Sequence, residues 1–130
     1  MNYLVVCQST PDKRNMVQQV FLALMMYGDP GWKVNKGSYT IFNPTTNSRI
    51  DFKTITQMSW LDNVVYHDIY RSFLYNQTET FEVKQTYDTY IRRTRKHYGK
   101  PDRFLEKLMK KMKSGDASSR EKGQYQWHIQ

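Results

Sequence analysis

The chain has 130 residues, of which 38% are hydrophobic and 15% aromatic, and its formal net charge is +8. A chain of this length is typical of a single domain and can bury a core without disulfide bonds or a structural metal. Its one cysteine, Cys7, excludes an internal disulfide and is typical of a reducing compartment. No apolar run is long enough to span a bilayer and no signal-peptide pattern opens the chain, so we expect a soluble, cytoplasmic protein.

A strand and a helix are predicted at the start of the chain. Tyr3–Gln8 is a compact, β-branched run that reads as a buried strand. Thr10 suits the N-cap of a helix and Pro11 its first position, and apolar residues then recur with helical period to about Tyr27. The turn residues 28–31 end this helix, so the chain opens in the manner of an α/β protein.

The middle of the chain predicts a β-hairpin. Gly37–Asn43 and Ser48–Thr56 alternate apolar and polar residues, and Pro44–Asn47 between them has the composition of a turn. Leu61–Tyr66 is a further apolar run that ends at His67 and Asp68, and its length allows either a strand or a buried helical turn.

Two basic helices are predicted next, one from Glu79 to Gly99 and one opened by Pro101 and ended by Ser114–Gly115. We expect one domain over residues 1–113, with an α/β-like body at 1–78 and a basic helical segment at 79–113, and a flexible tail at 114–130. The fold class is α/β or α+β: a small sheet with a hairpin, one helix after the first strand, and a basic helical C-terminal part. We also expect the body to keep its fold without the basic segment.

The positive charge is concentrated in this segment. The stretch from residue 92 to residue 113 holds ten basic and two acidic residues, so it carries the whole net charge and the rest of the chain is neutral. A charge run is usually a solvated helix face, but such a face normally pairs opposite signs at four-residue spacing, and here acids are nearly absent. The excess predicts binding to nucleic acid or to an acidic protein surface. The candidate binding residues are Arg92, Arg93, Arg95, Lys96, Lys100, Arg103, Lys107, Lys110, Lys111 and Lys113.

Catalytic signals are sparse. There is no phosphate-binding glycine loop, the three histidines are scattered, and no cofactor or structural metal is predicted. Asp51 and Lys53 stand two residues apart on a predicted strand and therefore share a face, as the acid and lysine of metal-dependent nucleases do. Alternating polar residues on a solvated strand produce the same pattern, and the upstream acid Asp29 lies in a turn. A nuclease using Asp51 and Lys53 is kept as an alternative.

Residues 4–68 resemble the middle of the ATPase domain of tailed-phage large terminases, the motors that package DNA. The similar pieces are LVVCQST followed by a helix, WKVNKGSYTIF, NSRIDFKT, and the apolar run VVYHD. In that family the acid ending the last run binds magnesium, which makes Asp68 a candidate metal ligand; a strand-end or capping role is the other interpretation. The family's phosphate loop is missing, and Ile69 stands where its catalytic glutamate is expected.

The resemblance implies a protein that is not a working ATPase but a relative or mimic from a phage or phage satellite, present in the cytoplasm of a host cell. We therefore predict a non-catalytic protein that binds nucleic acid or a nucleic-acid-processing machine, with components of the phage packaging motor as the implied partner. Besides the nuclease, a third hypothesis is a host-directed inhibitor whose basic helix docks in an acidic groove of a protein.

Overall fold

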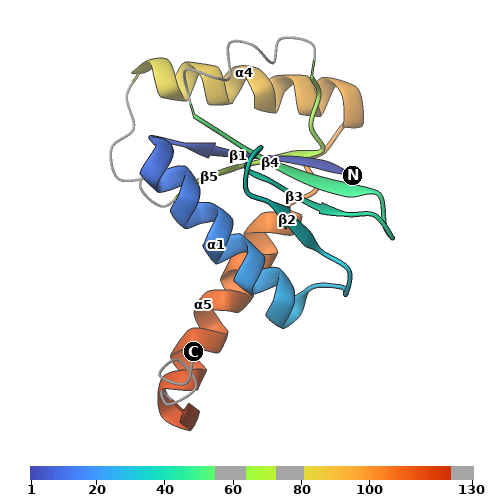
Figure 1. The fold of residues 1–130 in the computed structure, drawn as a ribbon. Coiled ribbons are helices and arrows are strands. Elements are labelled where there is room, and N and C mark those ends of the chain that lie inside the picture. Colours follow the sequence, from blue (N-terminus) through green and yellow to red (C-terminus); the bar gives the residue numbers. More distant parts are fainter. Residues whose placement is uncertain (55–63, 73–80, 124–130) are drawn as a thin grey trace.

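The described residues form a mixed five-stranded sheet with three helices, an α+β fold (Figure 1). The computed structural model describes residues 1–54, 64–72 and 81–123. The elements in chain order are β1 (Asn2–Cys7), α1 (Thr10–Tyr27), β2 (Lys33–Asn35), β3 (Thr40–Asn43), β4 (Ser48–Thr54), β5 (Asp68–Arg71), α4 (Phe81–Tyr98) and α5 (Phe104–Gly123). As expected, a helix follows the first strand.

The sheet has the strand order β2-β3-β4-β1-β5. β1 pairs in parallel with β4 and β5, whereas β2, β3 and β4 form an antiparallel meander. Leu4–Cys7 of β1 is completely buried, because this strand has a neighbour on each side and helices above and below it. That position explains why Tyr3–Cys7 is a continuous apolar run instead of an alternating one.

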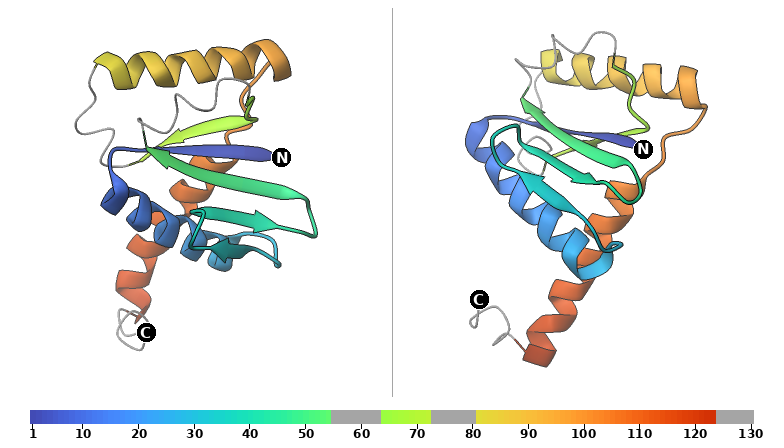
Figure 2. Two further views of the ribbon diagram at one scale, coloured as in Figure 1. Left: turned by 45° about the horizontal axis from the view of Figure 1, so that its top comes forward. Right: turned by 45° about the vertical axis from the view of Figure 1, so that its right-hand side comes forward.

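The helices cover the two faces of the sheet unequally. α1 and α5 pack together on one face, and α4 lies on the other (Figures 1 and 2). The first hydrophobic core, between the sheet and the α1–α5 layer, includes Val5, Phe52, Val20 and Leu105. The second and smaller core lies under α4 and consists of Leu4, Val6, Tyr66, Ile69, Tyr90 and Ile91.

The basic helices are therefore part of both cores. That the body keeps its fold without the basic segment stays a prediction, and the burial of these helices argues against it. α4 contributes Tyr90 and Ile91 to the second core. α5 contributes Leu105, Leu108 and Met109 to the first. Each basic helix thus has an apolar face with helical period, and these two faces cover the sheet.

The start of α1 differs by one residue from the prediction. Ser9, not Thr10, is the N-cap, and its hydroxyl accepts a hydrogen bond from the Asp12 backbone N–H at 3.3 Å. The buried Asp12 carboxylate in turn accepts hydrogen bonds from the Gln8 backbone N–H at 2.8 Å and from the Ser72 hydroxyl at 2.6 Å. One side chain thus connects the start of the helix to the ends of β1 and β5.

The predicted hairpin is confirmed as β3 and β4, with Asn43 paired to Ser48 across the turn. Its expected second strand, Ser48–Thr56, is observed to Thr54, and residues 55 and 56 lie outside the described part. β2, a three-residue strand at the sheet margin, was not predicted. So short a strand carries almost no periodicity, and its pairing with β3 defines it.

Two further boundaries differ from the predictions. Of the predicted run Leu61–Tyr66, residues 61–63 lie outside the described part and Val64–Tyr66 forms neither a strand nor a helix. The strand that follows begins at Asp68. α5 continues through Ser114–Gly115 to Gly123, because one glycine lowers helix stability without preventing the helix. Of the tail expected at 114–130, residues 124–130 lie outside the described part. Within the described residues, no helix combines the length and apolar character needed to cross a membrane.

Candidate nucleic-acid interface

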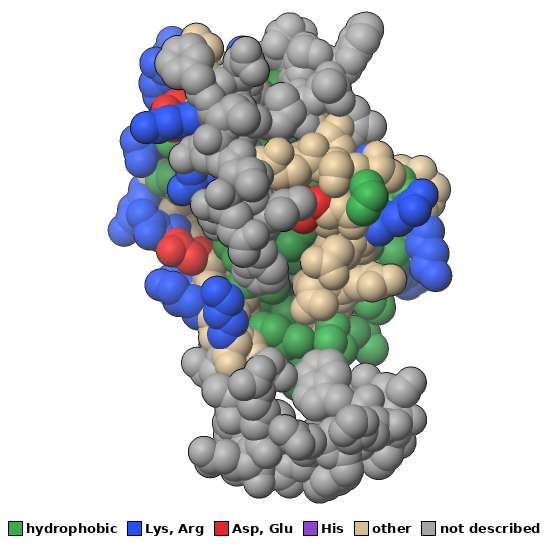
Figure 3. All heavy atoms as spheres, turned by 90° about the vertical axis from the view of Figure 1, so that its left-hand side faces the viewer, with side chains coloured by type: hydrophobic (Ala, Val, Ile, Leu, Met, Phe, Trp, Pro, Cys, Tyr) green, Lys and Arg blue, Asp and Glu red, His purple; other side chains and the backbone are tan. Residues whose placement is uncertain are grey.

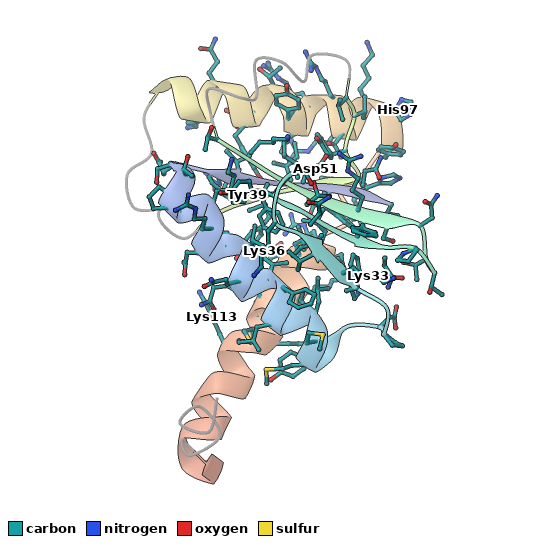
Figure 4. The ribbon with its side chains drawn as sticks, viewed as in Figure 1. Lys33, Lys36, Tyr39, Asp51, His97 and Lys113 are labelled. Atoms are coloured by element: carbon teal, nitrogen blue, oxygen red, sulfur yellow. The ribbon has the colours of Figure 1, made fainter. Side chains whose placement is uncertain are left out.

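The ten basic residues singled out in the sequence do not form one cluster. α4 and α5 lie on opposite faces of the sheet, so residues 92–98 and residues 104–113 belong to different layers. Figure 4 shows the separation, with His97 at the end of α4 above the sheet and Lys113 on α5 below it. The connection between them passes beside the start of β5, where the Asp102 backbone N–H donates a hydrogen bond to the His67 carbonyl at 3.0 Å.

Nine of these ten side chains are exposed, and the exception is Arg93. Its guanidinium lies 5.0 Å from the centre of the Tyr90 ring, and its Nη1 atom is buried without a hydrogen-bond partner among the described residues. Arg93 therefore packs against its own helix, as a cation–π contact permits, and is the poorest binding candidate of the ten.

A hollow of about 260 Å³ lies at the β5 edge between α4 and α5. Three arginines line it: Arg71 from β5, Arg95 from α4, and Arg103 just before α5. The Arg71 guanidinium lies 4.7 Å from the centre of the Tyr87 ring, which holds it against α4. Three distant parts of the sequence thus bring their cations to one place.

A second hollow, of about 570 Å³, extends this surface along α4. Arg95 lines both hollows, and Lys84 and Arg92 line the second. At the other end, Lys110 of α5 contacts Glu106, a lining residue of the first hollow, at 3.7 Å. We call the continuous surface formed by six cations the basic strip: Lys84, Arg92, Arg95, Arg71, Arg103 and Lys110.

Figure 3 shows Lys and Arg side chains following one another down one margin of the molecule, with acidic side chains among them. Glu106 is paired with both Arg103, at 3.2 Å, and Lys110. These are exposed pairs of the kind that contributes little to stability, so an anionic ligand can displace Glu106 from them at small cost. The other acidic residue among these cations is Asp88, which lines the second hollow.

Asp68 is the buried acid of the first hollow, with only 5% of its surface exposed. Burial raises the pKa of its carboxyl to about 6, and the nearby charges of Asp102 and Glu106 act in the same direction. The Ile69 backbone N–H and the Arg103 charge oppose this rise. Below pH 6 the carboxyl becomes neutral, and the hollow then presents three arginines against fewer negative charges.

Asp68 does not occupy the position that a magnesium-binding acid would have at the end of a strand. It is the first residue of β5, beside Tyr3 near the start of β1. Across the described part of the chain there is no group of three or more His, Cys, Asp or Glu side chains suited to a metal ion. A buried position at the start of β5 agrees with the structural interpretation of this residue.

Asp51 and Lys53 share a face of β4, as predicted, but the acid is already engaged. Asp51 is buried; its carboxylate accepts a hydrogen bond from Arg49 Nε at 2.6 Å and one from the Tyr66 hydroxyl at 3.0 Å. Figure 4 shows Asp51 on the sheet below α4. Burial raises the pKa of Tyr66, and the charge of Asp51 acts in the same direction, so the phenol remains a donor.

The tyrosines beside the basic segment have different roles. Tyr90 is buried in the second core, and Tyr87 packs against that core from its margin. Tyr98, the last residue of α4, is 40% exposed and stacks on His67 with ring centres 4.0 Å apart. Beside the basic strip, the Tyr87 ring is covered on one face by the Arg71 guanidinium.

Two residues of the basic strip were missed in the sequence. Lys84 precedes the +8 stretch, yet Lys84, Asp88, Arg92 and Arg95 follow helical spacing, so a helical plot would have found it. Arg71 has no such signal, because it joins the strip only through the pairing of β5 with β1. Comparisons with protein-family models, curated proteins and solved structures find no match for this chain.

Proposed function

We propose that this protein is a non-catalytic nucleic-acid-binding protein that contacts the phosphate backbone along the basic strip. The observation that carries the proposal is the convergence of Arg71, Arg95 and Arg103 on one hollow at the β5 edge. Arginine forks match phosphate oxygens in geometry and charge, and exposed cations in a row release counterions when a backbone binds.

The proposal differs from attraction by net charge alone, and paired charge reversals separate the two. Arg95→Glu/Lys110→Glu removes two cations of the basic strip. Lys96→Glu/Lys111→Glu removes two neighbours in the same helices that line neither hollow, each about 100° further around its helix axis. Both variants change the net charge by the same amount, and all four side chains are exposed.

We expect the first pair to weaken binding of a 20-base-pair DNA duplex on the order of tenfold more than the second pair, measured by fluorescence anisotropy at low salt. Equal losses would show that only total charge matters. No detectable binding of the unaltered protein to DNA or RNA would refute the proposal.

A protein partner with an acidic surface remains the competing hypothesis, including components of a phage packaging motor. Pull-down from the native host with and without nuclease treatment distinguishes the two. A complex that survives nuclease digestion and depends on Arg95 and Lys110 would assign the strip to a protein.

The nuclease alternative also stays a prediction, and a magnesium-dependent cleavage assay with Asp51→Ala as control tests it.

A further inference from the structure

Among the described residues, no helix lies on one face of the antiparallel part of the sheet. In the left view of Figure 2, β4, β3 and β2 lie toward the viewer with none of the helices in front of them. Val34, Ile41 and Ile50 point the other way, into the core formed with α1 and α5. Because side chains alternate along a strand, the residues next to these three lie on the uncovered face.

An aromatic ring lies between two cations on this face. Phe42 of β3 pairs with Lys33 of β2 on one side and with Arg49 of β4 on the other, so the three side chains form one row across the sheet. Lys33 is exposed, and the Arg49 side chain is 58% exposed. Phe42 is half-buried and belongs to neither hydrophobic core of the described residues.

The surroundings of this row favour an anionic ligand. Asp51 is the acid of the adjacent row, and its charge is compensated by Arg49 and by the Tyr66 hydroxyl. Lys53 lies two residues further along the same face of β4. A shallow hollow of about 330 Å³ adjoins Phe42, with Asn35, Ser38, Thr40 and Arg49 as its other lining residues.

We propose that the face of β2, β3 and β4 binds single-stranded nucleic acid, with one base stacked on Phe42 and the adjacent phosphates held by Lys33 and Arg49. A ring on an open sheet between cations supplies the two contacts that single strands need, stacking and charge neutralisation. The bases of a duplex are stacked on one another and cannot lie flat on this ring. The inference rests on the proposed function for its class of ligand but uses different residues.

The test measures binding of a fluorescein-labelled oligothymidylate and of a DNA duplex to the full chain. Phe42→Leu keeps an apolar side chain but removes the ring face, and we expect it to bind the oligothymidylate roughly 5- to 100-fold more weakly. Phe42→Tyr keeps the ring and should bind like the unaltered protein. Duplex affinity should be the same for all three proteins.

The results separate this inference from the proposed function. If Phe42→Leu binds the oligothymidylate normally while Arg95→Glu/Lys110→Glu loses affinity, the inference is wrong and the proposed function stands. If Phe42→Leu loses affinity for the oligothymidylate and Arg95→Glu/Lys110→Glu keeps it, the inference stands. The basic strip is then not the main interface for single strands. Failure of the unaltered protein to bind the oligothymidylate at low salt would overturn the inference outright.

A second measurement needs no variant and so does not depend on how Phe42→Leu folds. Irradiation of the unaltered protein with an oligonucleotide containing 5-iodouracil cross-links the base to a ring stacked on it. We expect the cross-linked peptide to include residues 40–43. Cross-links confined to other peptides would contradict the assignment of Phe42.

Discussion

Asp68 shows how one buried carboxyl makes folding depend on pH. Its pKa is about 6 in the folded chain, chiefly because of burial, against about 4 in an unfolded chain. Between these two values the folded state holds more protons than the unfolded state. The contribution of Asp68 to the free energy of unfolding is therefore largest below pH 4 and decreases as pH rises to 6.

Replacing Asp68 with asparagine removes this titration. We expect Asp68→Asn to raise the free energy of unfolding by about 1–3 kcal/mol at pH 7 relative to its effect at pH 4, since each unit of pKa shift corresponds to about 1.4 kcal/mol. Urea denaturation of both proteins at the two pH values gives the difference. If the effect of Asp68→Asn on the free energy of unfolding does not change with pH, ionisation of the Asp68 carboxyl does not destabilise the folded state.

At the scale of the elements, α4 and α5 each combine an apolar face with a charged face. The apolar face of α5 covers the sheet beside α1, and its lysines point away from that core. The two faces can therefore be altered independently. Substitutions intended to test binding should be confined to exposed cations, because changes on the apolar face alter folding.

The contrast between Leu105 and Lys107 tests this division within one turn of α5. Leu105 is fully buried, so Leu105→Ala should lower the free energy of unfolding by about 2–5 kcal/mol through lost burial and the cavity that remains. Lys107 is exposed, so Lys107→Ala should change it by less than about 0.5 kcal/mol. Urea denaturation measures both. Similar values for the two variants would mean that α5 does not pack against the sheet as described.

For the whole molecule, the distribution of charge matters more than its sum. At physiological salt the screening length is about 8 Å, so cations on opposite faces of the sheet act on a ligand separately. The α4 and α5 cations cooperate only where the chain passes the β5 edge and Arg71 joins them. This is why six residues, and not the whole +8 stretch, define the proposed interface.

The salt dependence of duplex binding follows from that count. Each phosphate contact contributes about −0.9 to the slope of log affinity against log salt concentration. We expect Arg95→Glu/Lys110→Glu to reduce the magnitude of this slope by about 2, and Lys96→Glu/Lys111→Glu to leave it nearly unchanged. Titrations between 50 and 200 mM salt supply the slopes. A reduction of the same size in both variants would contradict a defined strip.

The local elements of this protein were largely predictable from its sequence, because their signals are local. The helix after the first strand, the β3–β4 hairpin and the interruption at Gly99 each depend on periodicity, capping or turn residues within a few positions. The exposure of most of the basic residues was also predictable, since isolated charges are rarely buried.

Tertiary structure alone decided where those elements meet. The parallel pairing of β1 with β4 and β5 brings Arg71 to Arg95 and Arg103, and no spacing in the sequence encodes that distance. The pairing of Lys33 and Arg49 with Phe42 likewise exists only once β2, β3 and β4 are in register. Short-range chemistry determined the elements of this protein. Long-range strand pairing, driven by burial of two apolar cores, determined which charges share a surface.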